Sequence, residues 1–482
     1  MDRKQRMATR RNQSVARLNE SARALEMAMR EAGVTAADKD AFLNWSIGSL
    51  WHKFKEERMN QRILIENEVR GLGIHFPNGT VKKEYHKSFK LPVDKISEVE
   101  LLGAEELGLT FTIDDNGECT LSGKPNKAGD FTLRLQYNTV EGEPASELAI
   151  PVAFNPNPRD LWKNIPTDKD IPYYKPDSEN VYIKVDAGAD GSPKKDMVAA
   201  SQRGRSHAQE GKARDDHYSL FHCDNSDWYI MAVADGAGSA KYSRKGSEVA
   251  CNTVIEHCKT LLLDNPDFES SIREYEADRN NKDKRTEVTR HVIDIIYTGA
   301  KKAHDAVKKV AEANEESKLK DFATTLMFAV CKKYEFGWFI ASFWVGDGAM
   351  CLFDAENKTA KLLGTPDEGE FSGQTRFLTM PEIFRDPEVV AKRLRMAIVP
   401  DFTALFLMSD GISDPMFETD KNLNDYAKWE EFYNNLKTGF PDDEIGGVDL
   451  TDDNEDASHQ LLGWLDFWSP GNHDDRTIAI LY

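Results

Sequence analysis

WYIMAVADGAGSAKYSRKGSEVA, residues Trp228–Ala250, is the stretch that decides the fold of this chain. Its apolar run Ile230–Ala234 has the composition of a buried strand. Asp235 ends the run and Gly236-Ala237-Gly238 follows, so a carboxylate stands at a strand end beside backbone that can approach a ligand closely. A helix is expected from about Ser243. An ordinary Asp-Gly turn has the same local sequence, so the rest of the chain must show whether this acid is functional.

Four other acidic sites in the C-terminal part also lie where an apolar run meets a turn. They are Arg214-Asp215-Asp216 before the run from His217, Gly346-Asp347-Gly348 after FGWFIASFWV, Asp410-Gly411-Ile412-Ser413-Asp414 after ALFLMS, and Asp474-Asp475 before RTIAILY. We expect the strand ends to gather these acids in one cleft. Crowded carboxylates need a compensating charge. Oxygen ligands without an organised Cys/His cluster favour Mg²⁺ or Mn²⁺, and a pair of such ions suits the hydrolysis of phosphate esters.

Composition limits the classes of function. A length of 482 residues predicts two or three domains, and 40% hydrophobic residues suffice for real cores. The net charge of −20 disfavours binding to nucleic acid or to an anionic membrane. The six cysteines form no Cys-x-x-Cys pair, and neither an apolar leader nor a run of about 18 apolar residues is found. We therefore expect a cytoplasmic protein.

The character of the sequence changes three times along the chain. Residues 1–73 have helical periodicity with a break near Gly33, which predicts a helix hairpin. Residues 74–155 alternate apolar and polar positions between turn signals, which predicts a small β-sandwich. Its stretch TIDDNGECTLSGKPNKAGDFTLRLQY resembles bacterial immunoglobulin-like modules. Residues 156–194 are rich in proline and are interpreted as a linker that docks on the surface. Residues 195–482 mix strands and helices.

Within residues 195–482 the expected helices come in pairs between groups of strands, which favours an α+β fold with antiparallel sheets. The expected helices are Ser243–Leu263 and Thr286–Ala313. The expected strands are Met197–Ser201, His217–His222, Trp228–Ala234, Thr325–Cys331, Phe336–Val345, Met350–Phe353, Ala404–Met408 and Thr477–Tyr482.

An ordered series of motifs covers the same residues 195–482. It reads SQRGRSHAQEGKARDDHYSL, VADGAGSAKYSRKGSEVA, DFATTLMFAV, FWVGDGAM, GEFSGQTRFLT, LMSDGISD and HDDRTIAIL. In order and spacing it resembles the metal-dependent 2C-type serine/threonine protein phosphatases, and it is most similar to a bacterial subgroup with the D-G-A-G-S pattern. The resemblance implies a four-layer phosphatase fold, in which helix pairs flank an antiparallel β-sandwich, with a binuclear Mn/Mg centre at one end.

The resemblance also implies roles for single residues. Asp235 would bridge two ions, and the carbonyl of Gly236 would bind one of them. Asp410 and Asp474 would complete the protein ligands of the other ion, and Asp216 would act mostly through water. These assignments make Asp216 and Asp235 the central acids of catalysis.

Asp347 and Asp414 match positions that hold a third, weaker metal ion in bacterial members of the family. The mechanism that the resemblance implies is direct attack of a metal-bridged hydroxide on phosphorus, without a phosphoenzyme.

The sequence departs from the family pattern at two positions. Gly211 stands where many relatives have a phosphate-binding arginine, so Arg205, Lys212 or Arg214 could supply that charge. The guanidinium of Arg205 or Arg214 would suit phosphate best, although Arg214 could instead pair with the neighbouring acids. Ala237 stands where many eukaryotic relatives have a histidine proposed as general acid. His207 is the candidate for the substrate-side role, with a capping or core position as the alternative.

The leading prediction is a phosphatase that acts on phosphoserine and phosphothreonine in proteins. A phosphatase-fold binding protein with little turnover and a hydrolase of small phosphate esters are the alternatives. The expected partners are a phosphorylated protein, a cognate kinase or the target of that kinase, and a protein bound through residues 1–155.

Overall fold

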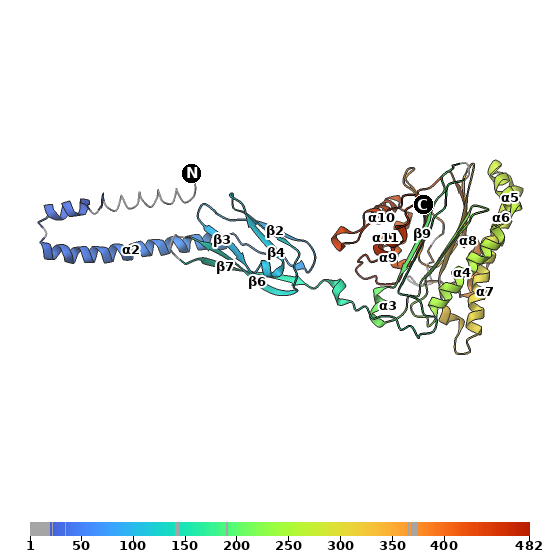
Figure 1. The fold of residues 1–482 in the computed structure, drawn as a ribbon, viewed down its shortest axis with the longest axis horizontal. Helices are drawn as coiled ribbons and strands as arrows, with labels where there is room; N and C mark the ends of the chain where they lie inside the picture. Colours follow the sequence, from blue (N-terminus) through green and yellow to red (C-terminus); the bar gives the residue numbers. More distant parts are fainter. Residues whose placement is uncertain are drawn as a thin grey trace. The chain divides into compact units, whose positions relative to one another are not determined.

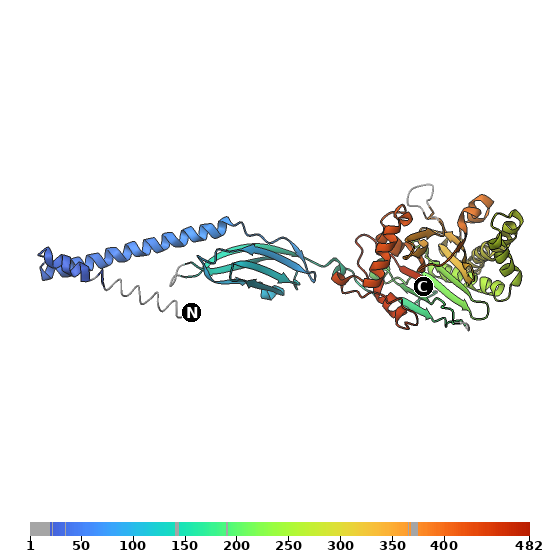
Figure 2. The same ribbon diagram turned by 90° about the horizontal axis from the view of Figure 1, so that it is seen from above.

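The chain is described here from a computed structural model (Figures 1 and 2). The described residues are 20–21, 23–33, 35–139, 144–188, 191–364, 366–367 and 375–482. The chain divides into two compact units, Met1–Asn157 and Pro158–Tyr482. No helix among the described residues is long and apolar enough to cross a membrane.

The first unit contains one long helix, α2, at Ala36–Gly71. Thr35 caps it, because its hydroxyl accepts a hydrogen bond from the backbone N–H of Asp38 at 3.3 Å. Near its C-terminal end, Ile65 and Val69 are buried in the core of the following sandwich. Helix is also found before the break at Gly33, from Glu20. The part of the predicted helix hairpin that precedes Glu20 lies outside the described residues.

Two small sheets complete the first unit. One has the order β1-β7-β6-β3 and the other the order β2-β5-β4. In β6 and β7 buried and exposed residues alternate, as in strands with one face on a core. The strands are β1 (Gly79–Thr80), β2 (Tyr85–Lys90), β3 (Ser97–Leu102), β4 (Leu109–Ile113), β5 (Glu118–Gly123), β6 (Gly129–Asn138) and β7 (Ser146–Asn155).

The second unit is built on two larger antiparallel sheets. The five-stranded sheet has the order β10-β11-β12-β13-β16, and the six-stranded sheet has the order β15-β14-β17-β18-β9-β8. The strands are β8 (Ser178–Ile183), β9 (Met197–Gln202), β10 (His217–Cys223), β11 (Trp228–Ala234), β12 (Leu326–Tyr334), β13 (Gly337–Val345), β14 (Ala349–Asp354), β15 (Thr359–Leu362), β16 (Leu394–Val399), β17 (Ala404–Met408) and β18 (Arg476–Leu481). All eight predicted strands are present, and β8, β15 and β16 were not predicted.

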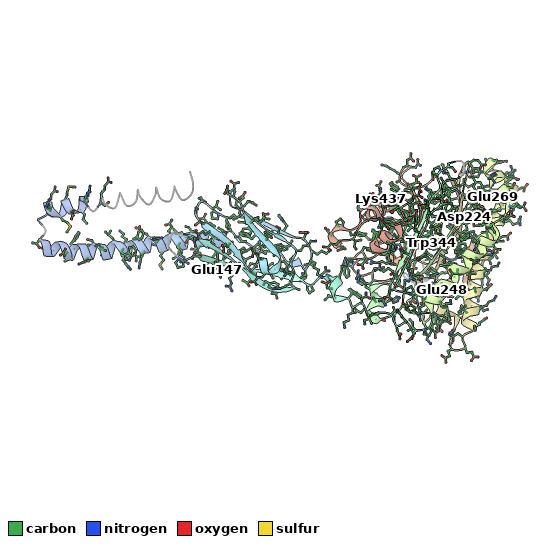
Figure 3. The ribbon with its side chains drawn as sticks, viewed as in Figure 1. Glu147, Asp224, Glu248, Glu269, Trp344 and Lys437 are labelled. Atoms are coloured by element: carbon green, nitrogen blue, oxygen red, sulfur yellow. The ribbon has the colours of Figure 1, made fainter. Side chains whose placement is uncertain are left out.

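Helices cover the outer faces of both sheets (Figure 1). On the five-stranded sheet lie α4 (Ser243–Leu262), α5 (Pro266–Ala277), α6 (Lys282–Val292) and α7 (Thr298–Glu312). On the six-stranded sheet lie α9 (Asp410–Phe417), α10 (Tyr426–Thr438) and α11 (Ala457–Trp464). The short helices α3 (Arg205–Glu210) and α8 (Pro387–Arg393) lie in connections. Trp344, labelled in Figure 3, is 1% exposed in the core between the sheets.

Two predictions differ from the structure. The single helix predicted at Thr286–Ala313 is α6 and α7 joined by a π-helical turn, Ile293–Tyr297. The predicted linker 156–194 contains β8, which pairs with β9 along its whole length. Residues from Pro158 onward therefore belong to the second unit, because this segment supplies an edge strand to its sheet.

Candidate metal centre

The strand register brings the acidic strand ends to one end of both sheets. In the antiparallel pairs, Ala234 lies opposite His217 and Leu326 lies opposite Val345. In the other sheet Met408 lies opposite Ala349. An antiparallel pair places the end of one strand beside the start of the next. The acids that follow β11, β13 and β17 and those that precede β10 and β18 therefore converge.

Asp235 is held at the end of β11 by two threonines. Its backbone N–H donates to Thr325 Oγ1 at 2.8 Å, and its carbonyl accepts from Thr325 N and from Thr324 Oγ1, both at 2.8 Å. Gly236 follows, and a Cβ atom there would lie 2.6 Å from the carbonyl oxygen of Asp215. The backbone of this turn therefore requires glycine and is fixed independently of the Asp235 carboxylate.

The predicted metal-binding acids come together as a group. Carboxylate oxygens of Asp235, Asp347 and Asp410 all lie within 4.8 Å of one another. Burial raises the pKa of Asp235 and of Asp410, and the charges of Asp216 and Asp474 raise both further. Asp414 lies close to the same set, because burial and then the charges of Asp347 and Asp474 raise its pKa to about 6. We call Asp216, Asp235, Asp347, Asp410, Asp414 and Asp474 the acid group.

Burial and mutual repulsion oppose ionisation of the acid group in the absence of metal. Burial, and then the charge of Asp475, raise the pKa of Asp216 to about 7. Burial followed by the charge of Asp410 raises the pKa of Asp235 well above its usual range. Both carboxylate oxygens of Asp216 and one each of Asp347 and Asp410 are buried without a hydrogen-bond partner among the described residues. Such a set fits divalent cations, which supply both the charge and the missing partners.

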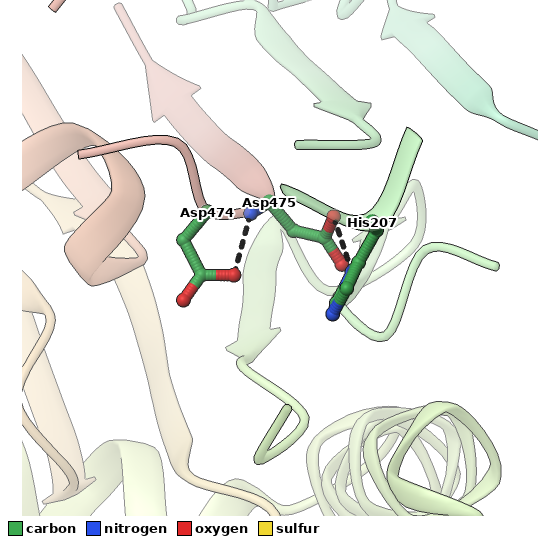
Figure 4. A group of neighbouring side chains, drawn as sticks. All are labelled: His207, Asp474 and Asp475. Atoms are coloured by element: carbon green, nitrogen blue, oxygen red, sulfur yellow. Dashed lines mark hydrogen bonds and ion pairs between the residues drawn. The ribbon is translucent and has the colours of Figure 1, made fainter. Parts of the chain in front are cut away.

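His207 lies beside this group and is oriented by Asp475 (Figure 4). The imidazole Nδ1 is 3.0 Å from Asp475 Oδ1, and Nε2 is 3.8 Å from Asp215 Oδ2. Burial works against the charged ring, but the hydrogen bond and the charge of Asp475 prevail and raise the pKa of His207 to about 9. A Cβ atom on Gly238 would lie 3.6 Å from Nε2. The ring thus reaches the glycine turn that follows Asp235.

The two predicted phosphate-binding arginines have other partners. The guanidinium of Arg214 is fully buried, donates to the carbonyl of Ser201 at 3.1 Å and forms an ion pair with Glu179. Arg205 donates to Asp466 Oδ1 at 2.5 Å and stacks on Trp468. Both side chains are held by these partners, so we do not retain either as a phosphate ligand.

Arg244, which the sequence did not single out, brings a guanidinium to Asp215, the chain neighbour of Asp216 in the acid group. Its Nη1 lies 3.8 Å from Asp215 Oδ1. Its Nη2 donates to the carbonyl of Pro172 at 2.7 Å, and its Nε to that of Tyr173 at 3.1 Å. Its place in the first turn of α4, nine residues after Asp235, was the only local signal in the sequence.

Asp475 is a further residue that the sequence prediction passed over in favour of Asp474. It is 2% exposed and accepts hydrogen bonds from the backbone N–H groups of Gly204 at 2.6 Å and Asp215 at 2.5 Å, besides His207. The adjacent acid pair was visible in the sequence, but its two members have different functions in the structure.

An α+β unit whose sheets gather unpartnered carboxylates at one end defines the class of metal-dependent hydrolases with an all-oxygen centre. Comparison with known families identifies the family within this class. The family model described as Protein phosphatase 2C matches residues 203–465, more than half of the chain. The chain therefore belongs to the protein phosphatase 2C family and is a serine/threonine protein phosphatase by class. This confirms the resemblance to the 2C-type protein phosphatases found in the sequence.

Solved structures of bacterial phosphatases resemble the chain at low identity. The Mycobacterium tuberculosis serine/threonine phosphatase PstP/Ppp is 14% identical, with a TM-score of 0.32, over 60% of this chain and 98% of that one. Stp1 from Staphylococcus aureus is 14% identical, with a TM-score of 0.31, over 66% and 96%. RsbX, solved in complex with magnesium, is 12% identical, with a TM-score of 0.29, over 60% and 96%. A comparison with curated proteins found no match.

Proposed function

We propose that the second unit hydrolyses phosphoserine and phosphothreonine in proteins at a binuclear Mn²⁺ or Mg²⁺ centre held by the acid group. The observation that carries this proposal is the set of buried carboxylate oxygens without partners in Asp216, Asp347 and Asp410, packed against Asp235. Burial and mutual repulsion raise the pKa of these acids, so that a bound cation would favour their charged forms.

In this proposal Asp235 would bridge two ions, and the carbonyl of Gly236 would bind one of them. Asp410 and Asp474 would bind the other ion, and Asp216 would act mostly through water. The threonines that fix the backbone of Asp235 support its bridging role, since a bridging ligand must keep one position. Asp347 and Asp414 provide a third, weaker site.

Ions bound at the acid group supply two things: charge that binds the phosphoryl oxygens, and a lowered pKa of a shared water, so that hydroxide is available near neutral pH. The protein's own residues do the rest. Arg244 places a positive charge at the edge of the group for the phosphate. His207, kept protonated by Asp475, holds a proton at Nε2 for the departing serine or threonine oxygen.

The finer architecture is proposed in the same terms. Residues 195–482 form the four-layer phosphatase fold, residues 74–155 form an immunoglobulin-like module, and residues 1–155 bind a protein partner. The phosphorylated substrate is a cognate kinase or its target. The two packed sheets of residues 79–155 support such a module. We place the protein in the cytoplasm. Its six cysteines are all buried and free, which supports a reducing compartment.

The direct test is hydrolysis of an aryl phosphate and of a phosphothreonine peptide with Mn²⁺. Activity is expected to disappear with chelator, and Asp235→Asn is expected to lower kcat by at least about a thousandfold, because the bridging charge is lost. Asp186→Asn, at an exposed carboxylate of the same unit, is the matched control and retains activity. Full activity in chelated protein would refute the proposal.

A further inference from the structure

A groove of about 480 Å³ opens at the acid group and is not used by the proposed chemistry. It lies between α9, α10 and the loop 467–472. Asp414 lines one end, and its carboxyl group belongs to the acid group. Asn472, also in the lining, accepts a hydrogen bond from the backbone N–H of Asp474 at 3.3 Å. The groove therefore borders the acid group at Asp414 and Asn472.

The lining combines an apolar floor with an acidic rim. Its apolar members are Pro415, Met416, Phe440, Phe467, Trp468 and Pro470. Its charged members are Asp414, Glu418 and Glu431, against the single cation Lys428, which leaves a net charge of −2. A surface of this kind attracts cationic chains that also carry apolar side chains, and it repels acidic ones.

Lys428 is only weakly paired with the acidic side chains of the groove. Its ammonium lies 3.1 Å from Glu431 Oε2, between residues three positions apart on α10, and the Glu431 side chain is 59% exposed. An exposed ion pair of this type contributes little free energy. A basic side chain of a ligand can therefore exchange with Lys428 at low cost, while Glu418, which follows the end of α9, stays available.

We propose that this groove binds the peptide segment next to the phosphorylated residue and selects substrates with basic and apolar residues in that segment. The inference rests on the proposed phosphatase activity, because the phosphoryl group at the acid group sets where the peptide begins. An extended chain leaving that position enters a groove lined by Asp414, Glu418 and Glu431 together with apolar side chains such as Trp468.

The test compares two phosphothreonine peptides that differ only in two flanking residues, Arg-Arg in one and Glu-Glu in the other, together with an aryl phosphate. The native full-length chain is expected to prefer the basic peptide by roughly three- to tenfold in kcat/KM, mainly through KM, from two exposed ion pairs. The double variant Glu418→Lys/Glu431→Lys is expected to abolish or reverse the preference and to leave aryl phosphate turnover unchanged. Glu430→Lys, on the same helix but outside the groove, keeps the preference.

The outcomes separate this inference from the proposed function. If the native chain has equal kcat/KM for both peptides and normal aryl phosphate turnover, the groove does not select basic peptides, and the proposed phosphatase activity is unaffected. If no substrate is hydrolysed, the proposed function fails, and binding of the same two peptides, now carrying a fluorescent label, is measured by anisotropy to test the groove alone. Tighter binding of the basic peptide that is lost in the double variant but not in Glu430→Lys supports the proposed groove. Equal binding of the two peptides overturns it.

Discussion

Asp474 and Asp475 are neighbours in the chain with opposite surroundings. Asp475 is buried and accepts hydrogen bonds from Gly204, Asp215 and His207, which ties three segments together. Asp474 is exposed as a whole residue, but partial desolvation of its carboxyl group, followed by the charge of Asp475, raises its pKa. Adjacent residues in extended backbone point to opposite faces. One acid of the pair is therefore available to metal, and the other positions the histidine.

The position of His207 predicts a dependence on the leaving group. His207→Ala is expected to lower kcat for a phosphoserine peptide by roughly a hundredfold or more, since the departing alkoxide needs a proton. For an aryl phosphate with an acidic phenol the same variant is expected to lose much less, because that leaving group departs without a proton. Steady-state kinetics on both substrates at one pH measure the difference.

Asp475→Asn is the companion variant, because it keeps the shape of the side chain but removes the charge that favours the protonated ring. It should show the same bias against the phosphoserine peptide, to a smaller extent. His459→Ala, at an exposed imidazole, is the control with no bias. Equal losses on both substrates in His207→Ala would assign the residue to structure instead of proton transfer.

The gathering of acids was predictable from sequence because it follows from strand ends, and antiparallel pairing brings strand ends together. The partner of Arg214 was not predictable in this way. Glu179 lies 35 positions earlier, in a segment without strand periodicity, and only the pairing of β8 with β9 brings it to the guanidinium. Likewise, nothing local to Arg244 shows that the carbonyls of Pro172 and Tyr173 will orient it.

Among the elements, the segment before β8 contacts the site directly. We call residues 158–177 the strap. Lys175, at its end, is 5% exposed, and its Nζ donates to the carbonyl of Asp216 at 3.0 Å and to Ser247 Oγ at 3.1 Å. Tyr173 packs edge-on against Tyr242 at 5.4 Å between ring centroids. The strap thus holds the backbone of one acid and the start of α4.

Removing the buried ammonium is expected to loosen this connection. Lys175→Met leaves the carbonyl of Asp216 and the hydroxyl of Ser247 without that donor, at a cost of about 1–3 kcal/mol in the free energy of unfolding. The Mn²⁺ concentration for half-maximal activity should rise, because Asp216 is less well placed. Thermal melts and a Mn²⁺ titration of activity measure the two effects.

Lys169→Met, at an exposed position of the same strap, is the control and should change neither quantity. A Lys175→Met protein with the native melting temperature and metal requirement would show that the strap does not support the site.

The elements missed from sequence share a physical cause. β8 is an edge strand with partly exposed residues throughout, preceded by prolines that favour extended linkers, so neither alternation nor a buried run indicated it. The π-helical turn at Ile293–Tyr297 interrupts a helix without proline or glycine, and its apolar face continues across it. The central strands β11 and β17, buried at every position, were predicted with their observed bounds.

At the scale of the whole molecule, the two units have separate cores. The core of the first unit consists of residues between Ile65 and Phe154, and the cores of the second begin at Val185 and Cys223. The acid group belongs entirely to the second unit. Ligands that bind the acid group are therefore expected to act on the stability of one unit only.

Calorimetry of the full-length chain is expected to show two unfolding transitions. Mn²⁺ at about a hundred times its Kd raises the melting temperature of only one of them, by several degrees.

In chelated protein the melting temperature of that same transition should fall as pH rises from about 5.5 to 7.5. The folded unit keeps protons on Asp216, with a pKa of about 7, and on Asp215 and Asp414, each with a pKa of about 6, which the unfolded chain has already released. Stability present at low pH is lost through this window, on the order of 1–3 kcal/mol. His207, with a pKa of about 9, acts in the same direction.

The variant Asp235→Asn tests whether the acid group causes both the stabilisation by Mn²⁺ and the loss of stability with rising pH. The variant removes one charge from the acid group, so its chelated form should melt higher than the native chelated protein at pH 7.5 and lose stability less steeply with pH. Mn²⁺ should no longer raise its transition, because the bridging ligand is gone. The other transition should be the same in the native chain and the variant at every pH and Mn²⁺ concentration. A chelated native protein that becomes more stable as pH rises from 5.5 to 7.5, or a metal response in both transitions, would contradict an acid group that is held together by bound cations within the second unit.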